Sequence, residues 1–217
     1  VSGINGVAWD AVELPSQFLE NWCWEPEALA QISGHYQNGE PLPTALLDAM
    51  LAARNYQAGM QMMRQLQLAL FDFLLHRDYL PATEGTSAST QVKNVQATNV
   101  QALLEQVRAE TSVAPVPTFN RFQHGFTHIF AGGYAAGYYS YKWAEVLSAD
   151  AFSRFEEEGV FNPDVGQSFL QQILEQGGSR EPMALFVAFR GREPSVDALL
   201  RHSGILDPLK SVAEESQ

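Results

Sequence analysis

Residues 60–80 read MQMMRQLQLALFDFLLHRDYL, and apolar side chains recur along them at every third or fourth position. Met63, Leu66 and Leu70 share one face of an α-helix at this spacing. Residues 44–55 repeat the pattern, with leucines and a methionine spaced by one, three and four positions. No alternation of period two continues long enough elsewhere to build a sheet. The sequence therefore predicts a mainly α, multi-helix fold with little or no sheet.

Prolines mark the expected starts of helices, because the first helical turn does not need the backbone N–H that proline lacks. Six of them precede apolar-periodic segments: Pro15, Pro26, Pro43, Pro163, Pro182 and Pro194. Asn162 stands directly before one of these prolines, where its side chain can cap a helix. Residues 83–91, 112–118 and 131–134 interrupt the periodicity with small polar residues, prolines and glycines, and are predicted loops.

The composition is that of an ordinary globular protein, with 46% hydrophobic and 18% charged residues among 217, and it excludes disordered and collagen-like classes. A net charge of -12 repels phosphate and anionic lipid, so we expect neither nucleic acid nor a membrane as a partner. The lone Cys23 allows no intrachain disulfide. Signal-peptide features and a long apolar run are both missing from the sequence. These features predict a cytoplasmic location.

A first candidate site lies in residues 12–24, which read VELPSQFLENWCW. In a helix that begins near Pro15, Glu13, Gln17 and Glu20 share one face at spacings of four and three. The opposite, apolar face is made of Phe18, Leu19 and Trp22. The polar residues are either a solvated acidic face, or they make Glu13 a metal ligand with Glu20 behind it as a hydrogen-bond acceptor.

A second candidate site lies in residues 126–143, which read FTHIFAGGYAAGYYSYKW. Tyr134, Tyr138 and Tyr141, at positions i, i+4 and i+7, are predicted to share one helical face. Such a stripe often belongs to a core. Three buried phenol hydroxyls would each need a partner, however, which also suits the lining of a polar cleft. The two glycines before them let the backbone bend and approach a ligand closely.

His124 and His128 form a His-x-x-x-His pair, which on one helix could bind zinc. With Glu13 they would make a set of two histidines and one carboxylate. Zincin peptidases place a glutamate directly after the first histidine, whereas Gly125 stands there in this chain. A self-contained zinc hydrolase is therefore one hypothesis among several.

Both candidate blocks, together with residues 152–159 and 190–194, resemble the C-terminal part of the zinc oligopeptidases of the thimet oligopeptidase and neurolysin family, above all its oligopeptidase A-like members. The resemblance covers nearly the whole chain. In that family a helix with His-Glu-x-x-His supplies two zinc ligands and the general base, and this motif is missing from the sequence. The resemblance thus implies that residues 1–217 are a single helical, C-terminal fragment of a zincin-like catalytic domain.

The resemblance also implies roles for individual residues. Glu13 matches the third zinc ligand, and Glu20 matches a glutamate that supports a zinc-binding histidine. Near the diglycine the family uses a histidine and tyrosines to hold the substrate backbone and the oxyanion. The positions matched to substrate binding are His128, Gly132, Gly133, Tyr134, Tyr138 and Tyr141. Among these, His128, Tyr134 and Tyr141 match the residues that act in catalysis.

The function implied by the resemblance is zinc-dependent hydrolysis of short peptides by the full-length enzyme. The fragment alone is expected to be inactive, with zinc absent or weakly bound. Its expected partners are peptides, the missing N-terminal part of the same enzyme, and a second copy that pairs with an uncovered apolar face at Phe18, Leu19 and Trp22. A non-catalytic helical module that binds peptides is the alternative function.

Overall fold

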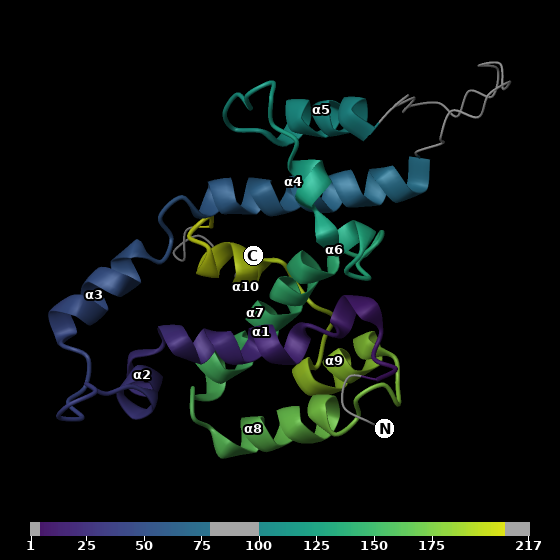
Figure 1. Cartoon of the computed structure of the whole chain (residues 1–217). Helices are drawn as coiled ribbons and strands as arrows, with labels where there is room; N and C mark the ends of the chain where they lie inside the picture. The colour runs from purple at the N-terminus through teal and green to yellow at the C-terminus, as the bar shows by residue number, and fades with distance from the viewer. Residues whose placement is uncertain (1–4, 79–99, 207–217) are drawn as a thin grey trace, which may run out of the picture. The chain divides into compact units, whose positions relative to one another are not determined.

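The computed structural model describes residues 5–78 and 100–206, and within them the chain forms ten α-helices and no strand (Figure 1). The α-helices are α1 (Leu14–Glu20), α2 (Pro26–Ile32), α3 (Thr44–Ala53), α4 (Ala58–Asp78), α5 (Val100–Thr111), α6 (Thr127–Phe130), α7 (Ser140–Glu158), α8 (Pro163–Phe169), α9 (Pro182–Arg190) and α10 (Asp197–His202). Shorter helical turns are η1 (Trp9–Ala11), η2 (Asn21–Trp24), η3 (Phe122–Gly125) and the π-helical η4 (Leu170–Leu174). The predicted mainly α fold is confirmed.

The helix starts follow the predicted proline positions. Pro26, Pro163 and Pro182 are the first residues of α2, α8 and α9. Asn162 caps α8 as predicted, since its Oδ1 accepts hydrogen bonds from the backbone N–H groups of Asp164 (2.9 Å) and Val165 (3.5 Å). The predicted loops at 112–118 and 131–134 contain no helix, and the third, at 83–91, lies outside the described residues.

The chain divides into two compact units. Unit 1 comprises residues 1–59 and 143–217, and unit 2 comprises residues 60–142. Across the described part of both units, none of the helices is long and apolar enough to cross a membrane.

The core of unit 1 joins α1 to α7, α8 and α9 (Figure 1). Its buried residues are Leu14, Phe18, Leu147, Ala151, Phe152, Phe155, Val165, Phe169, Ile173, Leu185, Phe186 and Phe189. Phe18 stacks on Phe169 with ring centroids 3.9 Å apart, and the Trp22 indole N–H donates to the carbonyl of Val160 (3.1 Å). These contacts fix the position of α1 and of Glu13, which directly precedes it.

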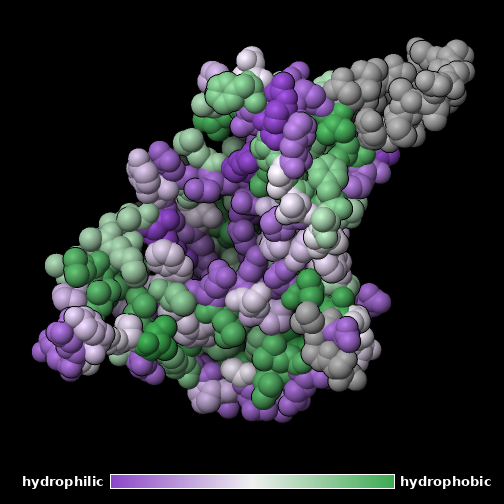
Figure 2. Space-filling model, in the orientation of Figure 1, coloured by the Kyte–Doolittle hydropathy of each residue, from purple (hydrophilic) through white to green (hydrophobic). Residues whose placement is uncertain are grey.

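The apolar face predicted at Phe18, Leu19 and Trp22 is not left uncovered. Phe18 is 2% exposed and Trp22 is half-buried, because α1 turns both rings into the core, and only Leu19 of the three is exposed. The self-association predicted through this face therefore has no structural basis. Hydrophobic side chains are exposed instead over α2 and α3 (Figure 2). Ile32 and Leu46 are among the exposed residues, and no residue of α3 is buried.

Unit 2 is built around two helices that run side by side, α4 and α5, with η3 and α6 packed against them (Figure 1). Its buried core consists of Leu68, Phe71, Leu75, Leu103, Leu104, Val107, Phe126 and Ile129. The helix α4 forms where the periodicity predicted it, but the face that it buries is a different one. Leu66 and Leu70 are exposed, whereas Leu68, Phe71 and Leu75 are buried against α5 and α6. This packing supports α6 and the turn that follows it.

Unit 1 buries the carboxylate of Asp150 completely on α7. Arg192 donates to both of its oxygens (2.6 Å each), the Ser195 backbone N–H donates to Oδ2 (2.7 Å), and Arg190 Nε lies 3.3 Å from Oδ1. Burial alone would raise the pKa of Asp150. The hydrogen bonds from Arg192 and Ser195 and the two guanidinium charges outweigh that effect and hold the pKa below its ordinary value of 3.8.

Asp150→Asn should destabilise the protein at pH 7 by about 3 kcal/mol, because it leaves two arginines near a neutral side chain. A carboxylate whose pKa is lower in the folded than in the unfolded state stabilises the fold at pH values above its unfolded-state pKa. This stabilisation is lost as the pH falls through the folded-state pKa. The gap between wild type and variant should therefore narrow below about pH 4. Urea unfolding at pH 7 and pH 3 measures both effects. Asp48→Asn, at an exposed carboxylate, should change stability by less than about 0.5 kcal/mol, and an equal loss there would contradict the assignment.

Candidate functional site

The two histidines of the His-x-x-x-His pair do not lie on one helix. His124 belongs to η3 and His128 to α6. Phe126 separates them with φ -81° and ψ 66°, outside the helical region, because its ring is buried in the core of unit 2. The helical i, i+4 arrangement that zinc binding by this pair would need is therefore not formed.

The diglycine after α6 forms a tight turn that is held by backbone hydrogen bonds to α6. Gly132 N–H donates to the carbonyl of Thr127 (2.7 Å), and Tyr134 N–H donates to the carbonyl of His128 (3.0 Å). A Cβ at Gly132 would lie 2.9 Å from both Cα and O of His128, and Gly133 has φ +81°. Both glycines are therefore needed, the first for close approach to the backbone of α6 and the second for its left-handed conformation.

Tyr134 and Tyr138 lie in the turns that precede α7, and only Tyr141 is in the helix, which begins at Ser140. The prediction of a helical tyrosine stripe is thus wrong in its geometry. The positive φ of Gly133 and of Ala136 (+56°) explains the difference, since an α-helix cannot pass through left-handed residues.

The turn nevertheless brings together the aromatic residues that the sequence singled out. His128 lies 5.8 Å from Tyr134, 5.7 Å from Tyr138 and 6.2 Å from Tyr141 between ring centroids. Tyr134 and Tyr141 stack at 5.0 Å with an interplanar angle of 14°. We call these four residues the His–Tyr cluster. His128 is exposed and the three tyrosines are half-buried, so the cluster is supported by the fold and open to solvent at one side.

The electrostatics of the cluster favour hydrogen-bond donation by phenol. Burial raises the pKa of Tyr138 above its ordinary value, and the neighbouring Tyr141 adds to the shift. The Tyr138 hydroxyl donates to Gln65 Oε1 on α4 at 3.4 Å. Three phenols and an imidazole in one place can donate to carbonyl oxygens or to a developing oxyanion.

Sequence reasoning missed one residue that holds this turn in place. The buried carboxylate of Asp72, on α4, accepts hydrogen bonds from the backbone N–H groups of Ala136 (2.9 Å) and Tyr138 (2.8 Å). The available signal was a charged residue within the apolar run LALFDFLL.

Glu13 and Glu20 lie at the two ends of α1 in unit 1. Glu13 is half-buried at the N-cap position, and Ser16 Oγ donates to its carbonyl (3.0 Å) and lies 3.4 Å from its Oε2. Glu20 is exposed at the last position of the helix. The fold thus presents one half-buried carboxylate at the start of α1, held in place by the packing of Leu14 and Phe18.

The described residues do not by themselves fit a zinc ion. Protein zinc sites use three or four ligands, and in the described part of the chain no three His, Cys, Asp or Glu side chains come together. Of the predicted set, His124 and His128 belong to unit 2 and Glu13 belongs to unit 1.

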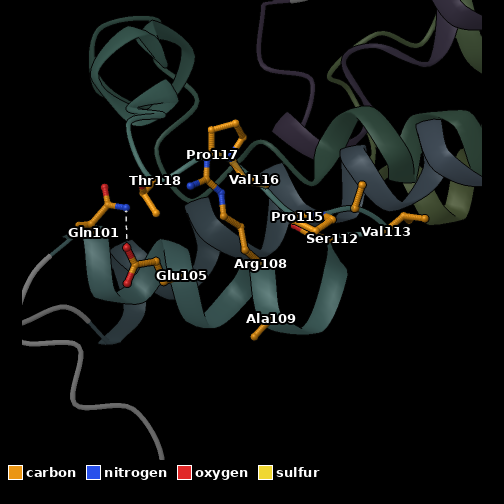
Figure 3. A pocket seen from close by; sticks show the side chains of 11 residues that line it. Gln101, Glu105, Arg108, Ala109, Ser112, Val113, Pro115, Val116, Pro117 and Thr118 are labelled. Atoms are coloured by element: carbon orange, nitrogen blue, oxygen red, sulfur yellow. Dashed lines mark hydrogen bonds between the residues drawn. The ribbon is translucent and has the colours of Figure 1, made fainter.

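Two cavities are lined by residues that do not belong to the His–Tyr cluster. One of about 480 Å³ in unit 2 lies between α5 and residues 112–118, with Arg108 pointing toward Pro117 (Figure 3). Among its polar groups, Gln101 donates to Glu105 (2.9 Å) and Arg108 Nη2 donates to Asn120 (2.6 Å), whereas Arg108 Nε is buried without a hydrogen-bond partner among the described residues. The other, of about 210 Å³ in unit 1, is lined by apolar side chains that include the neighbours of Glu13 in sequence. Neither cavity is lined by a predicted site residue.

Gly132→Ala should lower the free energy of unfolding of the protein by about 1–3 kcal/mol, because the new methyl group overlaps the backbone of His128. Gly125→Ala provides a matched control, since a Cβ there meets nothing within 4 Å. Thermal unfolding of both variants measures the difference. Equal unfolding midpoints of the two variants would mean that the turn accommodates the methyl group without loss of stability.

Several known proteins are similar to this chain in sequence. The profile of peptidase family M3 matches residues 1–205. The chain is 61% identical over 205 residues to oligopeptidase A of Salmonella typhimurium and to that of Escherichia coli. It is 48% identical over 210 residues to the probable cytosolic oligopeptidase A of Arabidopsis thaliana. These alignments cover 94–95% of this chain but only 28% of each relative, so the chain spans less than a third of their length. The chain belongs to peptidase family M3.

Proposed function

We propose that this chain is part of a peptide-bond hydrolase of the oligopeptidase A type, and that its His–Tyr cluster binds the backbone of a short peptide. Membership of peptidase family M3 supports the reaction class. The observation that carries the proposal is the convergence of His128 with Tyr134, Tyr138 and Tyr141. Because the chain spans only 28% of the length of its relatives, the activity is proposed for the full-length protein.

The chemistry of the cluster suits stabilisation of negative charge on a carbonyl oxygen. As a nucleophile adds to a peptide carbonyl, the oxygen gains charge, and fixed O–H donors stabilise it most at that stage. We propose that Tyr134 and Tyr141 are these donors and that His128 holds the peptide backbone. Tyr138 has a raised pKa and keeps its phenol proton, and its hydroxyl donates to Gln65 on α4. Gly132 and Gly133 shape the turn that positions the donors and the adjoining substrate contacts.

We propose that Glu13 contributes one carboxylate to a zinc site in the full-length protein. Its half-buried position beside the packed helix α1 supports a fixed ligand. The other ligands and the general base would come from residues outside this chain, as the family resemblance implies. Glu20 is proposed as a hydrogen-bond acceptor behind a histidine ligand, and the isolated chain is proposed to be inactive.

In the full-length protein, Tyr134→Phe and Tyr141→Phe should each lower kcat for a fluorogenic peptide about 100-fold and change KM by less than about threefold. A donor aimed at the oxyanion acts mainly in the transition state. Tyr139→Phe is the matched control, because Tyr139 lies in the same turn and outside the cluster. Normal turnover in both test variants would reduce the tyrosines to a packing role. Peptide binding by a wild-type protein without any hydrolysis would favour the non-catalytic module.

Glu13→Gln should lower the zinc content of the full-length protein together with its activity, because a neutral amide is a poor zinc ligand. Metal analysis of the purified variant gives the zinc stoichiometry directly. Glu27→Gln, at an exposed position in the first turn of α2, should leave zinc and activity unchanged. Full zinc occupancy in Glu13→Gln would contradict the ligand assignment.

A further inference from the structure

Asp72 is a carboxylate with no solvent exposure, placed in the middle of α4 beside the equally buried Phe71. A carboxylate in such surroundings destabilises a fold unless hydrogen-bond donors surround it. Its donors come from a segment more than 60 residues away in sequence. The role of Asp72 therefore concerns that segment as well as α4.

The two carboxylate oxygens of Asp72 hold the turn before α7 at two points. Oδ1 accepts from the backbone N–H of Ala136 (2.9 Å), and Oδ2 accepts from the backbone N–H of Tyr138 (2.8 Å). His76 Nδ1 lies 2.8 Å from Oδ1 on the next turn of α4 and completes the set. Hydrogen bonds from N–H groups to an ionised carboxylate are about twice as strong as neutral ones.

The backbone between these points needs such support. Ala136 has φ +56°, a left-handed conformation that is unfavourable for a residue with a Cβ. The bond from its N–H to Asp72 stabilises this conformation. The turn that results places Tyr138 against Gln65, also on α4, through its hydroxyl (3.4 Å).

We propose that Asp72 is a positioning residue for the proposed peptidase site, acting through the turn that carries Tyr134 and Tyr138 and leads into Tyr141. The proposal rests on the proposed function of the His–Tyr cluster. Asp72 does not touch the substrate. It fixes the backbone from which the phenol groups project, so that the donors are already in place when charge develops.

The test is Asp72→Asn in the full-length protein, because asparagine keeps the size of the side chain but presents an NH₂ group to one backbone N–H. Hydrogen exchange, followed by mass spectrometry of peptides that cover residues 132–139, should accelerate about tenfold or more. Exchange in α5 should not change. For a fluorogenic peptide, kcat should fall about 100-fold with KM within about threefold, since small displacements of catalytic groups have effects of this size.

Asp78→Asn is the matched control, with the same substitution on the same helix at a carboxylate that pairs with Arg77 (2.6 Å). It should leave exchange in the turn and kcat unchanged. If Asp72→Asn does not fold, Asp72→Glu keeps the charge and moves the carboxylate by roughly 1.5 Å. Asp72→Glu should also accelerate exchange at residues 132–139 and lower kcat, both by smaller factors than Asp72→Asn.

The outcomes separate this proposal from the proposed function. Unchanged exchange at residues 132–139 would overturn the anchoring role. Faster exchange with unchanged kcat would overturn the positioning role, and a rise in KM alone would do the same. The peptidase function is judged separately, by the wild-type protein and the tyrosine variants. A wild-type protein without hydrolytic activity would overturn that function, and with it the catalytic part of the Asp72 proposal.

Discussion

Each unit of this protein depends on one aspartate that is buried completely on its longest helix. Asp72 on α4 and Asp150 on α7 have no solvent exposure. A buried carboxylate requires donors from the chain packed beside it, and in both units a turn distant in sequence supplies backbone N–H groups. Each of these turns also lies close to a left-handed residue, Ala136 in one case and Gly191 in the other. The same device thus fixes the connection before α7 in unit 2 and the connection after α9 in unit 1.

Local sequence signals were sufficient to predict several of the helices but not the geometry of the turns. Apolar periodicity placed α3 and α4, and prolines placed the starts of α2, α8 and α9, because these signals act within a few residues of the structure they determine. The interruption of the helix at Phe126 could not be read in this way. It arises from the burial of that ring against α4 and α5, a contact between distant segments.

The sequence singled out the four residues of the His–Tyr cluster, but it did not predict how they are arranged. Helical spacing was the wrong reason to place Tyr134 beside Tyr141, since the two rings stack across a turn rather than along a helix. Asp72 was missed because its partners are backbone groups, which leave no mark in the sequence. Phe18 and Trp22 were misjudged for a related reason, since only the packed structure tells which apolar rings α1 turns inward.

The arrangement of the His–Tyr cluster also bears on the side from which the proposed peptide would reach it. Two residues of α4 hold Tyr138 in place. Its backbone N–H donates to Asp72 and its hydroxyl donates to Gln65. His128 is exposed, although its backbone carbonyl is bound by Tyr134 N–H. The cluster is therefore rigid on the side of α4 and open on the side of the imidazole. Donors fixed in this way need little reorganisation when a peptide binds. The chain supplies this surface and, in the proposal, the carboxylate of Glu13, whereas the other metal ligands and the base that the proposed chemistry requires would come from elsewhere in the full-length protein.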